Sequence, residues 1–356
     1  MIALQAYSSA RLAGALGGLT LPEARKLVSA VNRGFTLSAP APPVPGVRRP
    51  SMDLVRREGY VPELRVKRER ASALDPFLKL ALETRDGHVI ETVRIPLERE
   101  GRFSVCVSSQ VGCALACAFC ATGRLGLERN LETWEIVEQV RLVRQTLRGP
   151  SVPPSARVHG VVFQGMGEPL ANLDRVLEAI DAFCDPSGLA IDARNMTVCT
   201  AGIPGGIRRL AREAPRVRLG LSIASARRDV RRRLMPITAA HPLEDVIDAA
   251  VEHAKLTGLA PLWALTPLAG VNDTEEDAIA LGALAREFTL RAGVRPRVSI
   301  IPYNAIALHA DPFSRTDDVR ERAFRDVLAA HGHPTHKRYS GGGDVGAACG
   351  QLAGKA

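Results

Sequence analysis

The sequence predicts an α/β fold built on a partial parallel (β/α)6 barrel, with a small helical domain and a β-hairpin before it. From about residue 103, short apolar segments typical of buried strands alternate with longer segments of helical periodicity. Such alternation is typical of parallel sheets whose strands are joined by helices. Upstream, a proline-rich segment separates helical sequence from a strand–turn–strand pattern, which predicts the two additions.

A helical region, a linker and a β-hairpin are predicted before the barrel. Residues 1–36 have helical character, with a helix start at Leu21-Pro22, and the proline-rich stretch 39–46 reads as a stiff linker. A hairpin is predicted from two strand-like segments around an Asp86-Gly87 turn, at residues 77–84 and 89–95. We therefore predict three parts: a helical module with its linker (1–50), a basic connector with the hairpin (51–100) and the barrel (101–356).

The barrel itself is predicted from six strands and five helices. The strands are residues 103–107, 160–164, 196–200, 216–222, 261–265 and 297–302. The helices are residues 134–147, 173–183, 203–213, 243–255 and 275–288. Active sites of parallel barrels lie at the carboxyl ends of their strands. Three motifs follow the first, second and last of these strands: the cysteines at 113–120, Gly165-Met-Gly-Glu168-Pro169 and Tyr303-Asn304. We therefore expect all three motifs at one rim.

Composition narrows the class of protein. The 356 residues contain no uncharged run near the ~18 residues of a membrane span, and the first residues lack the features of a signal peptide. Seven cysteines, unevenly spread, do not suggest a secreted disulfide scaffold. We expect a cytoplasmic protein, monomeric and without a membrane partner.

The charge indicates a polyanionic partner. The net charge is +9, from 47 Lys and Arg against 38 Asp and Glu. Basic residues concentrate in two stretches, at 56–70 and at 208–233, although such runs can also be solvated helix faces. Aromatic residues make up only 4%, so base stacking along an extended single strand is not indicated.

The most specific motif is a C-x3-C-x2-C triad made of Cys113, Cys117 and Cys120. Three close thiolates can hold three irons of a 4Fe-4S cluster and leave the fourth open to the amino and carboxylate groups of S-adenosyl-L-methionine (SAM). Zinc usually takes C-x2-C pairs and a fourth ligand, and this sequence has no second pair. A zinc site or three buried thiols is therefore the weaker alternative.

The sequence around the triad resembles the RlmN/Cfr family of radical SAM RNA methyltransferases. The resemblance rests on Cys106-Val-Ser-Ser-Gln-Val-Gly-Cys113, on Gly165-Met-Gly-Glu168-Pro and on the tail Asp344-Val-Gly-Ala-Ala-Cys349-Gly-Gln-Leu, and it runs from about residue 80 to 354. It implies a radical SAM barrel that methylates an adenine ring carbon in rRNA or tRNA, at C2 or C8, with C2 favoured. It also implies an electron donor such as flavodoxin or ferredoxin.

The resemblance assigns chemical roles to three residues. Cys349 would take a methyl group from a first SAM, and a second SAM would be cleaved to activate that methyl for attack on the RNA. Cys106 would then release the product by forming a transient disulfide with Cys349. Glu91, in Glu91-Thr-Val-Arg-Ile-Pro96, matches the proton acceptor, although its spacing to Cys106 is longer than usual. Without the resemblance, Glu91 would read as an exposed hairpin carboxylate.

The residues implied for SAM binding are Gly167, Glu168, Cys199, Ser222, Ile223, Ala224 and Asn304. Several positions depart from the family pattern: Cys199 replaces Ser, Ala224 replaces His, and Tyr303-Asn304-Ala305 replaces Trp-Asn-Pro. Ser340-Gly-Gly-Gly-Asp344 also replaces an Arg-Gly-Asp-Asp-like stretch. Because the chemical residues are kept and presumed RNA contacts differ, the pattern suits a divergent paralogue with another RNA target.

Two alternatives stay open. The chain could be a radical SAM enzyme acting on a different RNA, a peptide or a small molecule, although its basic charge and its Cys349 motif argue against the last two. It could also be a degenerate member that only binds RNA, although it keeps all five key cysteines.

Overall fold

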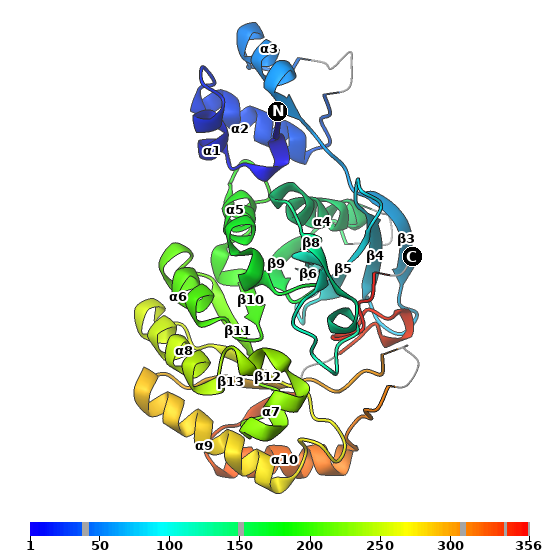
Figure 1. The fold of residues 1–356 in the computed structure, drawn as a ribbon. Helices are drawn as coiled ribbons and strands as arrows, with labels where there is room; N and C mark the ends of the chain where they lie inside the picture. Colours follow the sequence, from blue (N-terminus) through cyan, green and yellow to red (C-terminus); the bar gives the residue numbers. More distant parts are fainter. Residues whose placement is uncertain (38–42, 149–152, 307–310, 338–339, 355–356) are drawn as a thin grey trace.

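The computed structural model describes residues 1–37, 43–148, 153–306, 311–337 and 340–354. Within them, one large sheet has the strand order β14-β13-β12-β11-β10-β9-β6-β5-β4-β3. In this order, each pair of neighbouring strands between β14 and β6 is parallel. The neighbouring pairs β6–β5, β5–β4 and β4–β3 are antiparallel. The sheet curves without closing, with helices on its outer side (Figure 1). This confirms the predicted partial barrel with a β-hairpin extension.

All six predicted barrel strands are present within a few residues of their expected bounds. They are β6 (Arg102–Cys106), β9 (Arg157–Phe163), β10 (Met196–Thr200), β11 (Arg218–Ser222), β12 (Leu262–Leu265) and β13 (Arg297–Ile300). A further parallel strand that was not predicted, β14 (Thr335–Lys337), pairs with β13 at the edge of the sheet.

The five predicted helices are confirmed as α4 (Thr133–Gln145), α5 (Leu173–Cys184), α6 (Pro204–Glu213), α8 (Leu243–Thr257) and α9 (Glu275–Ala292). The helix α4 shows why the pattern works, because its apolar stripe of Ile136, Val137, Val140 and Val143 is fully buried. Two further helices of the barrel part were not predicted, α7 (Arg228–Leu234) and α10 (Asp318–Ala330).

The predicted hairpin is confirmed as β4 (Leu78–Glu83) and β5 (Val89–Pro96), and β3 (Arg65–Ala71) adds an edge strand. The C-terminal segment lies against this extension (Figure 1). Two hydrogen bonds fix it there, because Asp344 accepts from the Ser72 hydroxyl and from the Ala73 amide. The extension therefore holds the C-terminal segment next to the barrel.

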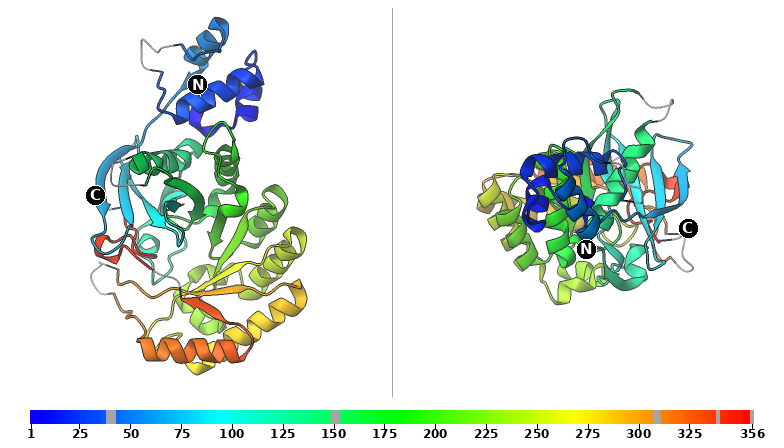
Figure 2. Two further views of the ribbon diagram at one scale, coloured as in Figure 1. Left: turned by 180° about the vertical axis from the view of Figure 1, so that it is seen from behind. Right: turned by 90° about the horizontal axis from the view of Figure 1, so that it is seen from above.

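The N-terminal part contains α1 (Ser9–Ala15), α2 (Leu21–Asn32) and α3 (Arg49–Glu58), with β1 (Ile2–Ala3) paired to β2 (Gly59–Tyr60). The predicted helix start is confirmed by a capping box between Thr20 and Glu23, a motif worth ~1 kcal/mol. Its own core includes Leu12, Leu27, Val31, Met52 and Val55. This part sits at one end of the molecule (Figure 2).

Residues 39–42 of the predicted proline-rich linker lie outside the described residues. None of the described helices is long and apolar enough to cross a membrane.

Candidate active site

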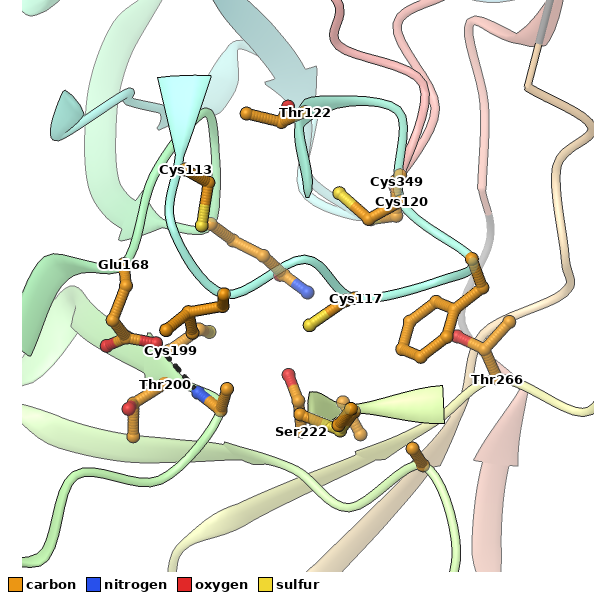
Figure 3. Close-up of a pocket in the computed structure, with 18 of the residues that line it drawn as sticks. Cys113, Cys117, Cys120, Thr122, Glu168, Cys199, Thr200, Ser222, Thr266 and Cys349 are labelled. Atoms are coloured by element: carbon orange, nitrogen blue, oxygen red, sulfur yellow. Dashed lines mark hydrogen bonds between the residues drawn. The ribbon is translucent and has the colours of Figure 1, made fainter. Parts of the chain in front are cut away.

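A cavity of about 150 Å³ lies at the carboxyl ends of the parallel strands (Figure 3). Its wall takes residues from the loops and ends of all six predicted strands: Cys113, Gly165, Thr200, Ser222, Thr266 and Tyr303. The three sequence motifs therefore meet at one rim, as the strand pattern predicted. Thr266 had no role in the sequence argument.

The cysteine triad is presented by a small hairpin, β7 (Gln110–Cys113) and β8 (Gly126–Asn130). At Gly112, φ is +74°, and a Cβ there would lie 2.0 Å from the Gly126 carbonyl oxygen, so only glycine fits. The chain then loops over the cavity, held by a hydrogen bond from the Ala118 amide to the Leu234 carbonyl. Cys113, Cys117 and Cys120 all line the cavity (Figure 3).

The three thiols suit an iron–sulfur cluster by their chemistry. Burial raises the pKa of Cys113 to about 11 and also raises the pKa of Cys117 and of Cys120. They are thus thiols at neutral pH, and binding a cluster would release their protons. No group of three His, Cys, Asp or Glu side chains among the described residues is already close enough to hold a metal ion. Three soft thiols that line one cavity match the donor set of iron–sulfur ligation in residue type.

Glu168 lies in the wall of the cavity, but its carboxylate is occupied by the backbone. One oxygen accepts from the Leu170 amide at 3.0 Å and the other from the Ala201 amide at 2.9 Å. Burial raises the pKa of Glu168. Beside it, Gly167 has φ of +99°, and a Cβ there would lie 2.5 Å from Cβ of Gln110. This glycine lets the motif pass close to the cysteine hairpin.

The other residues predicted for SAM divide into two groups. Cys199, Ser222 and Ala224 line the cavity with Gly167 and Glu168. Ile223 is instead a core residue whose amide donates to the Ala264 carbonyl at 2.9 Å. Asn304 also lies outside the lining, and its side-chain amide donates to the Cys349 carbonyl at 3.2 Å and to the Ser340 hydroxyl at 2.9 Å.

Cys349 lies where two cavities meet. It lines the cavity of the cysteine triad and also a second cavity of about 30 Å³, whose wall contains Cys106. The tail is tied to the triad loop, because the Ala121 amide donates to the Gly350 carbonyl at 2.8 Å. The structure therefore brings both predicted methyl-transfer cysteines to one place, from opposite ends of the barrel sequence. No disulfide joins them here.

Glu91 is close to the tail but lines neither cavity. It is only 1% exposed, and its carboxylate pairs with Lys79 at 2.8 Å and accepts from the Ala353 and Gly354 amides. Lys79 also donates to the Gly346 carbonyl at 3.1 Å. This pair therefore holds the Cys349 loop on both sides. The sequence offered one signal for Lys79: a single cation inside the apolar run of a predicted strand.

The arginine stretch 208–233 is mostly neutralised or buried. Its ion pairs are Arg208–Glu252, Arg209–Asp174, Arg209–Glu213, Arg216–Asp192, Arg227–Glu276 and Arg228–Glu244. Exposed pairs of this kind contribute only ~0.2–1 kcal/mol each, so their main effect is to cancel charge. Arg231 is 1% exposed and cannot face a phosphate, which contradicts its place in the expected RNA surface.

Comparison with known proteins agrees with this geometry. Residues 107–281 match the Radical SAM superfamily. A probable RNA methyltransferase of Sorangium cellulosum (strain So ce56) is 58% identical, over 96% of this chain and 90% of that protein. The dual-specificity RNA methyltransferase RlmN of Syntrophobacter fumaroxidans is 41% identical, over 81% of this chain and 79% of that protein.

A solved structure matches over the whole chain. It is a radical SAM methyltransferase from Sphaerobacter thermophilus, 31% identical, with a TM-score of 0.88 and coverage of 100% of both chains. Because the match covers this whole chain, it spans the barrel together with its additions. The chain belongs to the RlmN/Cfr family of radical SAM RNA methyltransferases.

Proposed function

We propose that this protein methylates an adenine ring carbon in rRNA or tRNA, at C2 rather than C8, through an S-methylcysteine at Cys349. The position of Cys349 is the observation that supports this most. It faces the cavity that holds the cysteine triad and the cavity that holds Cys106, so one loop can serve loading and release. The family implies a 4Fe-4S cluster and SAM as cofactors.

Cys113, Cys117 and Cys120 would hold the cluster, and two SAM molecules would be used per turnover. When bound, the cluster with SAM supplies the radical chemistry needed to functionalise an unreactive ring carbon. Gly167, Glu168, Cys199, Ser222 and Ala224 would form the SAM wall. Ile223 and Asn304 would support this wall without lining it. Ile223 would hold the end of its strand through its backbone hydrogen bond, and Asn304 would hold the Cys349 loop through the Cys349 carbonyl.

Three protein residues would then act in successive steps on the RNA. Cys349 holds the transferred carbon as a thioether. The Cys106 thiolate then attacks the Cys349 sulfur, the bond from that sulfur to the carbon breaks, and the carbon keeps the electron pair and takes up a proton to become the methyl group of the product. Glu91 would accept the ring proton. In this structure Glu91 binds the Ala353 and Gly354 amides, so it can act as a base only after the tail releases it. We therefore infer that tail movement accompanies turnover.

Other expectations rest on the sequence and on the family. The target adenine would be unstacked, because a ring carbon inside a helix is out of reach of a buried thiol. A flavodoxin or ferredoxin would supply electrons to a monomeric enzyme in the cytoplasm. The helical module 1–50 and the connector 51–100 would help the barrel segment 101–356 to grip RNA.

The basic edge strand β3 is the RNA surface that the geometry favours. Cross-strand pairing places Cys106, Val93, Lys79 and Arg70 in one row on the same face of the sheet. The row starts at the proposed release cysteine and ends at the exposed edge, where Arg68 lies two residues from Arg70. The neighbours Arg65 and Lys67 pair with Glu83, whereas Arg68 and Arg70 have no ion pair among the described residues.

Reversing the charge of Arg68 and Arg70 together should weaken RNA binding and flatten its salt dependence. Loss of two phosphate contacts on a single strand lowers the slope of log K against log salt by about 1.4. Filter binding over a salt series measures this. The matched control is Arg232→Glu with Arg233→Glu, a pair that is also exposed and without ion pairs among the described residues. A loss confined to the control pair would place the RNA on α7 instead.

Nucleoside mass spectrometry tests the activity itself. RNA from cells lacking the gene should lose 2-methyladenosine at the target, and the wild-type gene should restore it. Restoration by Cys349→Ala would contradict the methyl-carrier assignment. Loss of 8-methyladenosine would move the reaction to C8, and an unchanged nucleoside profile would favour a protein that binds RNA without modifying it.

A further inference from the structure

Arg231 is a buried cation with no carboxylate bound to it. It lies on α7 and is 1% exposed. None of the ion pairs among the described residues includes it, and Glu244 acts on it only at a distance while pairing with Arg228. Burial lowers the pKa of Arg231 to about 10, which still leaves it charged at neutral pH.

The guanidinium binds three backbone carbonyls instead of an acid. One Nη donates to the Ala201 carbonyl at 2.7 Å, and the other donates to the Ser222 carbonyl at 2.9 Å and to that of Ile223. These carbonyls stand at the carboxyl ends of β10 and β11. Ala201 and Ser222 are also in the cavity wall. The planar fork of arginine therefore fixes the spacing of two strand ends that build the site.

The helix α7 that carries this cation packs against the loop of the cysteine triad. The Ala118 amide of that loop donates to the Leu234 carbonyl at 2.9 Å, and Cys117 packs against the apolar cluster that contains Val230 and Leu234. A buried cation is unfavourable unless it is paired with an anion. Carbonyl dipoles satisfy its hydrogen bonds in part, but its Nε–H has no partner among the described residues. The Cys117 thiol, which packs against the same helix, becomes anionic once it is a cluster ligand.

We propose that Arg231 is a positioning residue with two separable effects: its fork sets the SAM-facing ends of β10 and β11, and its charge balances the thiolate-bound cluster beside Cys117. The inference rests on the proposed cofactor site. A fixed positive charge near a cluster favours the reduced, more negative state, because net charge is one of the factors that set its potential. Arg231 would thereby ease the electron transfer that SAM cleavage requires.

Two substitutions separate the effects. Arg231→Lys keeps the positive charge but cannot bind the carbonyls of both strand ends with one planar group. SAM affinity should therefore fall about tenfold or more, as is typical when a residue that orients a binding site without touching the ligand is replaced. Arg231→Gln removes the charge and keeps amide donors, so the oxidised cluster should be favoured about tenfold, or 59 mV for a one-electron couple. The control Arg232→Gln, an exposed neighbour on α7, should change neither quantity.

Iron content, a redox titration followed by electron paramagnetic resonance, and SAM binding by equilibrium dialysis give the readouts. A wild-type protein without cluster would contradict the proposed function itself. With cluster present in all variants, an unchanged potential in Arg231→Gln together with unchanged SAM affinity in Arg231→Lys would overturn this inference alone. If melting curves show that Arg231→Gln does not fold, unchanged SAM affinity in Arg231→Lys suffices to overturn the positioning role.

Discussion

The Cys117→Ala protein should purify without a stable cluster and should cleave SAM no faster than the background. Two thiolates hold a cubane poorly, and Cys117 is the middle cysteine of the triad that lines the cavity. Iron and sulfide analysis after anaerobic reconstitution, followed by detection of 5′-deoxyadenosine, measures both effects. Cys184→Ala is the matched control, because Cys184 ends α5 and does not line this cavity. Full iron content in Cys117→Ala would remove the cluster assignment.

The second large effect is expected from Cys106→Ala. This variant keeps Cys349 and the triad, so it should load and activate the methyl group and form the carbon–carbon bond to RNA. It lacks the thiol that would attack the Cys349 sulfur, so the protein should stay joined to its RNA. Denaturing gels of protein expressed with its target RNA should show a slow, nuclease-sensitive band. Normal turnover without such a band would make Cys106 a packing residue.

The barrel was predictable from sequence because each strand is an apolar run buried between the helices and the cavity. Those runs are long enough to stand out, and their carboxyl ends necessarily share one rim. The edge strand β14 has three residues, and two of them are exposed, so no apolar pattern marks it. The helix α7 was missed because its seven residues, rich in arginine, carry little apolar periodicity.

The candidate site was predictable where a motif meets a strand end and not where it depends on register. The three triad cysteines, Glu168 and Cys349 were expected together, and the structure brings them to one cavity. Lys79 was not expected, because its pair with Glu91 depends on how β4 and β5 align. Removing one member of such a buried pair costs about 3–5 kcal/mol, so this contact is a substantial part of how the tail is held.

Arg231 was expected at the surface and is buried instead. Three consecutive arginines read as one basic surface, yet successive residues of a helix point about 100° apart. On α7, Arg232 and Arg233 are exposed while Arg231 turns into the core. A charge run in a helix therefore predicts a surface only for the residues on its outer face.

The central claim is that Cys349 carries the carbon that is transferred to RNA. Its most direct test is mass spectrometry of the Cys106→Ala adduct after protease and nuclease digestion. We expect a single cross-linked peptide that contains Cys349, with a methylene group between its sulfur and one adenine. An adduct at another residue, or a Cys106→Ala protein that releases methylated RNA with an unmodified Cys349, would contradict the account.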